Sequence, residues 1–329
     1  MIISRTPTRI SFFGGGTDYP DWYEVHDGSV ISATINKYSY ITVRNLPPFF
    51  PYKHRIRYFK NEEVHDVSDI KHPSVRECLK FLSIDRGIEV VHNADLPARS
   101  GLGSSSTFTV GMLNALYAHQ KYLPTKRELA VNAIEIEQQI IKESVGSQDQ
   151  VAAAFGGLNY IKFSRIGQFE VNPILLSDDR LHDLQSHLLL CFTGFSRTAS
   201  EIAAKQIKKI TTNTRILNQI SSLTSEALIS LTQDQKDIRI FGELLNNQWR
   251  LKRELDETVS NEVIDSLYDK GIRAGATGGK LLGAGAGGFF LFFAEPRFHQ
   301  KIIDSLHDKM FVPFRFDTTG SSIVYYSND

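Results

Sequence analysis

The chain has 329 residues, of which 41% are hydrophobic and 22% are charged, and its 37 basic and 37 acidic side chains leave a formal net charge of zero. This composition argues against a disordered chain, and the charge balance gives no support for a surface that binds nucleic acid or another polyanion. The length suffices for a large core and for two domains, which we place at 1–178 and 179–329.

The first half of the chain alternates predicted strands and helices. Strand-like patterns cover 8–13, 30–44 (with a turn inside), 54–59, 88–92 and 158–163, and helical patterns cover 74–83 and 108–119. A capping box that runs from Thr125 to Glu128 predicts a further helix, which ends near Lys142. A turn at Gly146 then leads into a loop that carries Asp149.

Helices dominate the second half. We predict a strand over 188–192, two or three helices over 198–257, and a helix over 261–269 that ends at Gly271. A loop over 274–287, a strand over 288–294, a helix that opens with Pro296, and strands over 314–316 and 321–326 complete the chain. The expected fold class is α+β, with two layers in each domain around one cleft.

No feature of the sequence points to export or to a membrane. Cys78 and Cys191 lie in apolar segments and are typical of buried thiols in a reducing compartment. The apolar run at the N-terminus is too short for a signal peptide, and the longest uncharged run near the C-terminus, 281–294, is shorter than a membrane span. We therefore expect a cytoplasmic protein.

A glycine- and serine-rich segment, 97–107, lies between a predicted strand and a predicted helix. Its glycines permit positive φ and a close approach of the backbone to a ligand, and its serines stand where the helix begins. Hydroxyls, free N–H groups and the positive end of the helix dipole therefore converge, which predicts a polyphosphate site formed by Gly101, Leu102, Gly103, Ser104, Ser105 and Ser106. The alternative is an ordinary helix start with a serine N-cap. The segment is not a P-loop, because the Gly-Lys-Ser/Thr ending is absent.

Two acids follow this segment. On the helix predicted over 125–142, Glu137 lies on the apolar face and Glu135 on the polar face. A carboxylate on an apolar face is costly without a partner, so Glu137 is either a Mg²⁺ ligand or an acid at the edge of the core. Asp149, in a loop of small residues, can accept a hydroxyl proton as a substrate oxygen attacks a γ-phosphorus.

Two further glycine clusters stand at the two ends of the sequence. Gly14-Gly15-Gly16-Thr17-Asp18 follows a strand that carries Arg9, and it offers bare backbone and a carboxylate to a ligand with hydroxyl groups. The other, which is the third glycine cluster along the chain, runs from Gly278 to Gly288 and includes Gly283, Gly285 and Gly287. For each cluster, the glycines can be explained either by tight packing or by ligand binding.

Three glycine clusters in this order, with an acid between the second and third, resemble the GHMP small-molecule kinase family. The resemblance rests on segments 7–19, 97–105 and 280–288 and covers nearly the whole chain. It implies an N-terminal domain like the second domain of ribosomal protein S5, a ferredoxin-like C-terminal domain, and ATP in the cleft between them. It also implies that Gly101 to Ser106 hold the phosphates, that Ser105 (or Ser104) and Glu137 hold Mg²⁺, and that Asp149 is the catalytic acid with Arg9 as the cation beside it.

Within that family, segments 9–18, 33–36, 147–157 and 193–197 resemble the D-glycero-D-manno-heptose 7-phosphate kinases. This implies phosphorylation of the anomeric hydroxyl, with Gly16, Thr17 and Asp18 at the sugar. Ser196 and Arg197 supply hydroxyl and guanidinium donors for the distal phosphate. The implied partner is a small sugar phosphate, with no nucleic acid and no membrane, and a homodimer stays open.

Three alternatives remain at this stage. One is another sugar-1-kinase, for fucose or for an unphosphorylated heptose, and a second is a regulator on the same fold that binds sugar and ATP without catalysis. The presence of both Glu137 and Asp149 counts against the regulator. A diphosphate decarboxylase also fits the family, but the first glycine cluster is of the sugar-kinase type.

Overall fold

The computed structural model describes residues 1–164, 168–194, 199–233 and 235–327. Within these residues the strands form two sheets. The first sheet contains β1 (Ile2–Phe13), β2 (Gly28–Asn45), β3 (His54–Arg57), β4 (Asn61–Val64), β5 (Ile88–Ala94), β6 (Leu158–Phe163), β7 (Phe169–Pro173) and β12 (Ser322–Tyr326). The second contains β8 (Leu188–Phe192), β9 (Gly278–Leu281), β10 (Phe289–Phe293) and β11 (Met310–Phe311).

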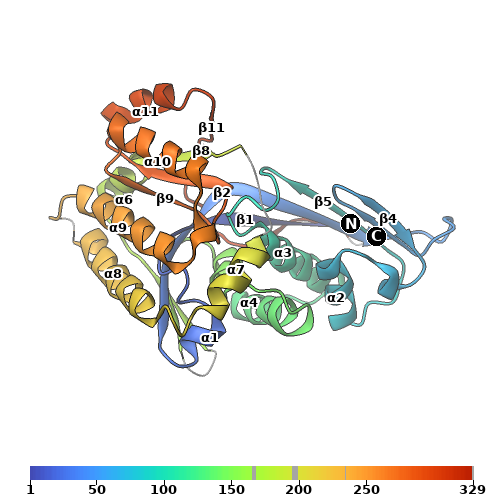
Figure 1. The fold of residues 1–329 in the computed structure, drawn as a ribbon. Helices are drawn as coiled ribbons and strands as arrows, with labels where there is room; N and C mark the ends of the chain where they lie inside the picture. The colour runs from blue at the N-terminus through green and yellow to red at the C-terminus, as the bar shows by residue number, and fades with distance from the viewer. Residues whose placement is uncertain (165–167, 195–198, 234, 328–329) are drawn as a thin grey trace.

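The helices fall into two groups (Figure 1). Along the first sheet lie α1 (Pro20–Tyr23), α2 (Pro73–Phe81), α3 (Ser104–His119), α4 (Lys126–Ile134) and α5 (Gln148–Phe155). The others are α6 (Asp178–Ser186), α7 (Ala199–Lys208), α8 (Thr214–Thr232), α9 (Arg239–Leu255), α10 (Glu262–Ala274) and α11 (His299–Ser305). Short 3₁₀ turns cover Val67–Asp69, Glu257–Val259 and Pro296–Phe298. No helix among the described residues is long and apolar enough to span a bilayer.

The first sheet branches along β2. The first half of β2 pairs with β6 and the second half with β5, while β1 runs antiparallel along nearly its whole length. The turn predicted inside 30–44 is wrong, since β2 is continuous and the register merely shifts opposite Pro7 and Thr8. A bulge absorbs the extra residues without reversing the strand.

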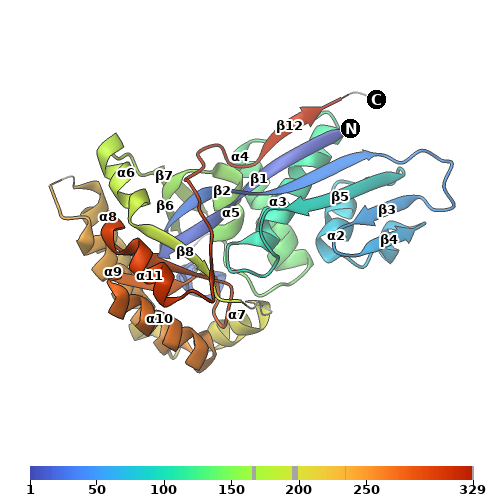
Figure 2. The same ribbon diagram turned by 90° about the horizontal axis from the view of Figure 1, so that it is seen from above.

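The chain end returns to the first sheet. β12 pairs antiparallel with β1, with Ile2 opposite Tyr326 and Arg5 opposite Ser322. Figure 2 shows β12 beside β1, and Met1 exchanges backbone hydrogen bonds with Ser327. The strand predicted over 314–316 is reduced to a single bridge between Ile35 and Phe316. The division at 178 stays a prediction.

The two sheets share one apolar core at the end of β1. Phe12 and Phe13, the last two residues of β1, meet the ring of Phe241 on α9, with centroid distances of 5.6 and 5.1 Å. Phe241 in turn contacts Phe293 of β10. All five residues of β10 are buried, which explains why this strand is an unbroken apolar run. This packing brings the glycine clusters of the two halves together.

Three local predictions are corrected. Asp149 lies in the first turn of α5 rather than in a loop. Gly271 lies inside α10, where a Cβ would stand 2.2 Å from the ring of Phe292, and the helix ends at the left-handed Gly275 (φ +119°). The loop predicted over 274–287 contains β9. At Gly271 the absence of a side chain serves close packing against Phe292 rather than the end of a helix.

Candidate functional site

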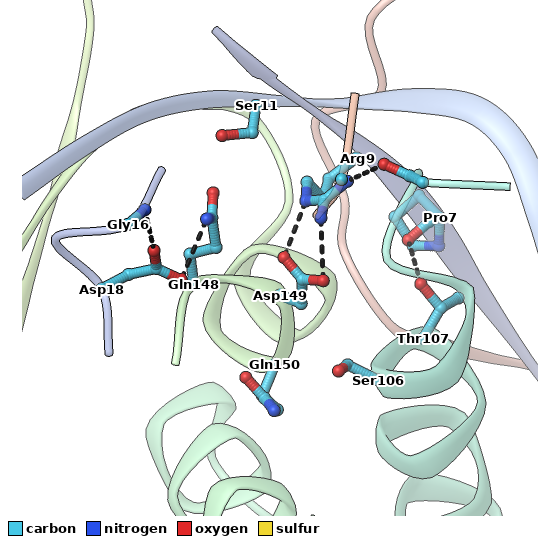
Figure 3. Close-up of polar contacts among 12 residues, drawn as sticks. Pro7, Arg9, Ser11, Gly16, Asp18, Ser106, Thr107, Gln148, Asp149 and Gln150 are labelled. Atoms are coloured by element: carbon cyan, nitrogen blue, oxygen red, sulfur yellow. Dashed lines mark hydrogen bonds and ion pairs between the residues drawn. The ribbon is translucent and has the colours of Figure 1, made fainter. Parts of the chain in front are cut away.

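Arg9 on β1 and Asp149 on α5 form a bidentate ion pair (Figure 3). Arg9 Nε donates to Asp149 Oδ1 at 2.7 Å, and Arg9 Nη2 donates to Oδ2 at 2.8 Å. Arg9 is 4% exposed, whereas the Asp149 side chain keeps 23% of its surface accessible. Two parallel charge-assisted bonds fix the plane of the carboxylate. The pair therefore presents an oriented carboxylate that an incoming group can still reach.

The glycine- and serine-rich segment lies directly against this pair. Arg9 Nη1 donates to Gly101 O at 2.8 Å, and the Arg9 backbone N–H donates to Leu102 O at 3.0 Å. Gly103 is left-handed (φ +74°), and a Cβ there would stand 3.2 Å from Asp149 Oδ2. Bare backbone is thus required where the segment passes the ion pair.

The start of α3 differs from an ordinary serine cap. Its N-cap residue is Gly103, and no side chain caps the helix. The serine N-cap alternative is therefore wrong, and the first-turn N–H groups of α3 have no side-chain acceptor of that kind. Ser104 Oγ accepts from the Arg99 N–H at 3.2 Å, Ser105 is exposed, and Ser106 is buried. The helix start has the form of an anion site.

Glu137 points inward, as the helical pattern predicts. It is fully buried, whereas Glu135 is exposed, and both lie in a π-helical turn, Glu135–Ile140, that follows α4. Such turns occur often at functional sites. The hydroxyl that reaches Glu137 belongs to Ser106, which donates to Oε2 at 2.7 Å, and Gln150 Nε2 donates to the same oxygen.

The other oxygen of that carboxylate is unsatisfied. Glu137 Oε1 and the neighbouring Gln150 Oε1 are both buried without a hydrogen-bond partner among the described residues. Burial raises the pKa of Glu137 to about 7, against the hydroxyls of Thr109 and Ser106 and the amide of Gln150, which lower it. Two orphaned oxygens and a hydroxyl are hard donors of the kind that Mg²⁺ prefers, so the residues present fit a divalent cation.

A second cluster of polar groups surrounds Asp18, which is 3% exposed. Its carboxylate accepts from the Gly16 N–H and from Gln148 Nε2, each at 2.9 Å. Burial, with the charge of Asp149 as a smaller contribution, raises the pKa of Asp18. Ser11 Oγ and Gln148 Oε1 are buried near Gly15 without a partner among the described residues. These atoms could meet the hydroxyl groups of a ligand beside Asp149.

The other residues predicted at the sugar lie in different settings. The Thr17 hydroxyl is buried, and it donates to Gly14 O and contacts the backbone of Ser29. A Cβ on the left-handed Gly16 would stand 3.1 Å from Leu217 of α8. Ser196 and Arg197 lie outside the described residues.

The third glycine cluster packs against the second, backbone to backbone. A Cβ on Gly101 would lie 2.5 Å from Leu282 O, and a Cβ on Gly283 would lie 2.5 Å from Gly101 Cα. Gly285 faces the backbone of Val259 in the same way, and Gly287 has a φ of +153°. Packing therefore accounts for Gly283 and Gly285, and it places their loop beside the predicted phosphate segment.

Two buried lysines next to these loops escaped the sequence analysis. Lys252 of α9 donates to Leu281 O at 3.1 Å and to Gly283 O, and Lys280 of β9 donates to Ser11 O and Phe12 O at 2.8 and 2.9 Å. Ser11, Gln148 and Gln150 escaped it as well, and Ser106 was predicted at the phosphates but not as the partner of Glu137. Lys280 lies within the third cluster and could have been found there, whereas Lys252 has no local signal in a helix rich in charged residues.

Comparison with known proteins gives a consistent result. The model "GHMP kinases N terminal domain" matches residues 73–157, and "GHMP kinases C terminal" matches residues 226–311. The chain is 29% identical to a D-glycero-alpha-D-manno-heptose 7-phosphate kinase of Campylobacter jejuni, over 93% of both chains. It is 27% identical to a bifunctional fucokinase/GDP-fucose pyrophosphorylase of Arabidopsis thaliana, over 88% of this chain and 29% of that protein.

Solved structures confirm the predicted fold. A D-glycero-D-manno-heptose 1-phosphate kinase from Bacteroides thetaiotaomicron superposes with a TM-score of 0.82 over 100% of both chains, at 24% identity. A putative sugar kinase from Campylobacter jejuni superposes with a TM-score of 0.72 over 98% of this chain and 97% of its own, at 26% identity. With both domain models matched and three glycine clusters in place, the chain belongs to the GHMP kinase family.

Proposed function

We propose that the protein is an ATP-dependent sugar kinase that phosphorylates the anomeric hydroxyl of D-glycero-D-manno-heptose 7-phosphate to give the 1,7-bisphosphate. The observation that carries the kinase assignment is the Arg9–Asp149 pair held against Gly101 and Gly103 at the start of α3. The similarity to a heptose 7-phosphate kinase over 93% of the chain supports the choice of acceptor.

The geometry supports a direct phosphoryl transfer. The phosphates of ATP bind to Gly101–Ser106 at the amino end of α3, where backbone N–H groups and the helix dipole favour negative charge. The acceptor oxygen attacks the γ-phosphorus, the bond from that phosphorus to the bridging oxygen breaks, and ADP leaves. Asp149 takes the proton of the attacking hydroxyl, and Arg9 holds its carboxylate in place.

Glu137, with a serine hydroxyl of the first turn of α3, would hold Mg²⁺. The orphaned Glu137 Oε1 and the contact with Ser106 favour this set, and Ser105, the hydroxyl implied by the family resemblance, is its exposed neighbour. The cation supplies charge neutralisation for the phosphates.

The acceptor sugar binds at the polar cluster around Asp18. The buried carboxylate and the unpartnered Ser11 Oγ and Gln148 Oε1 are suited to a ligand with several hydroxyl groups. Ser196 and Arg197 are our candidates for the distal phosphate of the heptose.

A second acceptor, L-fucose, is favoured by the similarity to fucokinases. The fucokinase/GDP-fucose pyrophosphorylase of Arabidopsis thaliana and the L-fucokinase/L-fucose-1-P guanylyltransferase of Bacteroides fragilis match about nine-tenths of this chain at 27% and 25% identity. This chain spans only 29% and 35% of those proteins.

One screen separates the two acceptors. ATP consumption is measured with purified protein and Mg²⁺ over heptose 7-phosphate, unphosphorylated heptose, fucose, galactose and mevalonate, and the phosphorylated position is assigned by ³¹P NMR. We expect turnover of heptose 7-phosphate with a new signal at the anomeric position. Turnover of fucose alone would replace our acceptor with the second candidate, and no turnover of any sugar would refute the kinase assignment.

A further inference from the structure

Lys252 of α9 carries a buried ammonium group whose partners are two carbonyl oxygens. The residue is 5% exposed, and Nζ donates to Leu281 O at 3.1 Å and to Gly283 O. No carboxylate among the described residues forms an ion pair with it. Burial of a charged group without an ion-pair partner costs free energy, and an anion that binds nearby would offset that cost.

The two carbonyls belong to the third glycine cluster, Gly278 to Gly288, and that cluster packs directly against the phosphate segment, Gly101 to Ser106. A Cβ on Gly283 would stand 2.5 Å from Gly101 Cα, and Gly101 O accepts from Arg9 at 2.8 Å. Arg9 in turn holds Asp149. A continuous set of contacts therefore runs from Lys252 through the third loop and Gly101 to Arg9 and the candidate catalytic acid.

Positive charge is in excess around Lys252. Arg9 of β1 and Lys280 of β9 are the cations that interact with it, and the facing acids are Asp18, from the loop after β1, and Asp149, which is paired with Arg9, so three cations face two carboxylates. Burial first, and then Arg9, lower the pKa of Lys252 to about 7, against the opposing effect of Asp18. Lys280 is also buried, and its pKa lies well below the ordinary value. Bound polyphosphate would supply the missing negative charge.

We propose that Lys252 is a positioning residue for the nucleotide: it fastens the third glycine loop onto the phosphate segment, and its buried charge is balanced only when the phosphates of ATP or ADP are bound. The inference rests on the proposed use of ATP, and it adds a residue on a remote helix to the nucleotide site. It implies that nucleotide binding near neutral pH is accompanied by proton uptake, because the bound anion favours the ammonium form.

The test is calorimetric titration with ADP and Mg²⁺, without sugar, at pH 7.0 in two buffers of different ionisation enthalpy. For the wild type we expect uptake of a fraction of a proton more than ADP itself requires, because burial lowers the pKa of Lys252 to about 7 and leaves it partly deprotonated at that pH. Lys252→Met should lose this uptake and bind ADP about tenfold more weakly or worse, the scale expected for a lost charged hydrogen bond.

Two further variants keep the test decisive. Lys252→Arg retains a donor and a charge but does not titrate near neutral pH, so it should bind ADP within a fewfold of the wild type without the extra proton uptake, even if Lys252→Met fails to fold. Gln206→Leu is the matched control, because Gln206 Nε2 donates to Ala284 O of the same loop at 2.8 Å and carries no charge. We expect it to keep the proton uptake of the wild type.

The outcomes separate this inference from the proposed function. Equal ADP affinity and equal proton uptake in the wild type and Lys252→Met or Lys252→Arg would overturn the inference. An identical loss of ADP affinity in Lys252→Met and Gln206→Leu, with proton uptake unchanged, would also overturn it. Lys252 would then support the loop by hydrogen bonding alone, without a role for its charge. A wild type that binds ADP with the expected linkage but phosphorylates no sugar would refute the sugar kinase and leave the role of Lys252 supported.

Discussion

At the scale of single residues, Asp149 is the side chain on which the proposed chemistry depends most. Its carboxylate keeps 23% of its surface accessible while Arg9 binds both of its oxygens. We expect Asp149→Asn to lower kcat by about two orders of magnitude or more, the usual contribution of a general base, and to leave ATP affinity nearly intact. Steady-state kinetics and ADP titration measure the two effects, and turnover within a fewfold of the wild type would remove Asp149 from proton transfer.

Glu137 connects the metal site to stability. Burial raises its folded pKa to about 7 from an ordinary value near 4.5, so the folded state holds a proton that the unfolded state has already lost. The stability that this group contributes is complete below about pH 4.5, and it falls as the pH rises toward 7.

Replacement of Glu137 tests this dependence. Glu137→Gln should raise the melting temperature of the metal-free protein at pH 8 and have little effect at pH 4.5, because only the ionised carboxylate is penalised. It should also weaken Mg²⁺-dependent activity, with partial rescue by excess Mg²⁺. Glu135→Gln, an exposed acid in the same turn, is the control. An unchanged metal dependence would show that Glu137 is structural.

Arg197 tests the acceptor, although it lies outside the described residues. If it holds the distal phosphate, its removal should cost about 1.5–3 kcal/mol, the range for hydrogen bonds to charged groups. Arg197→Ala should then raise KM for heptose 7-phosphate roughly ten- to a hundredfold and leave the unphosphorylated heptose almost unaffected. The ratio of kcat/KM for the two sugars is the measurement. An equal loss for both sugars would place the distal phosphate elsewhere.

At the scale of elements, the contact between the second and third glycine clusters should be intolerant of any side chain. Gly101 is left-handed (φ +82°), and a Cβ there would lie 2.5 Å from the backbone oxygen of Leu282. Gly101→Ala must move one loop away from the other, and we expect ATP affinity to fall about tenfold or more. In Gly15→Ala the nearest contact is an ordinary 3.8 Å, so its melting temperature should stay close to that of the wild type. Unchanged ATP affinity in Gly101→Ala would contradict the packing described here.

Element boundaries were predicted best where a local signal exists. The predicted helix start at Thr125 is confirmed, since Thr125 Oγ1 accepts from the Glu128 N–H at 3.1 Å, while the Glu128 carboxylate accepts from the Tyr122 hydroxyl. Gly271, in contrast, looks like a helix terminator but accommodates the ring of Phe292 from another element. The start of α5 at Gln148 also lacks a side-chain cap, so no cue distinguished Asp149 on a helix from Asp149 in a loop.

At the scale of the whole molecule, β12 couples the end of the chain to its beginning. It pairs with β1, and Ser321 just before it contacts Thr6 Oγ1 and accepts from Asn114 Nδ2, each at 2.9 Å. Truncation after Gly320 should therefore lower the free energy of unfolding by about 2–4 kcal/mol, because several hydrogen bonds of about 1 kcal/mol each are lost. Urea denaturation measures the change, and the half-exposed Val324→Thr should be nearly neutral. An unchanged urea midpoint in the truncated chain would show that β12 adds nothing.

The sequence by itself determined the family, the order of the three glycine clusters, and the inward position of Glu137, because glycine runs and helical periodicity are local patterns that physics constrains directly. Only the tertiary structure paired Arg9 with Asp149, packed Gly283 against Gly101, and buried Lys252 against the third glycine cluster. These contacts join residues about 30 to 180 positions apart, and no periodicity or spacing encodes which buried groups will meet. The sequence pointed to Ser105 (or Ser104) beside Glu137, whereas the structure brings Ser106 to that carboxylate, because the first turn of α3 and the π-helical turn must both be placed before their facing side chains are known.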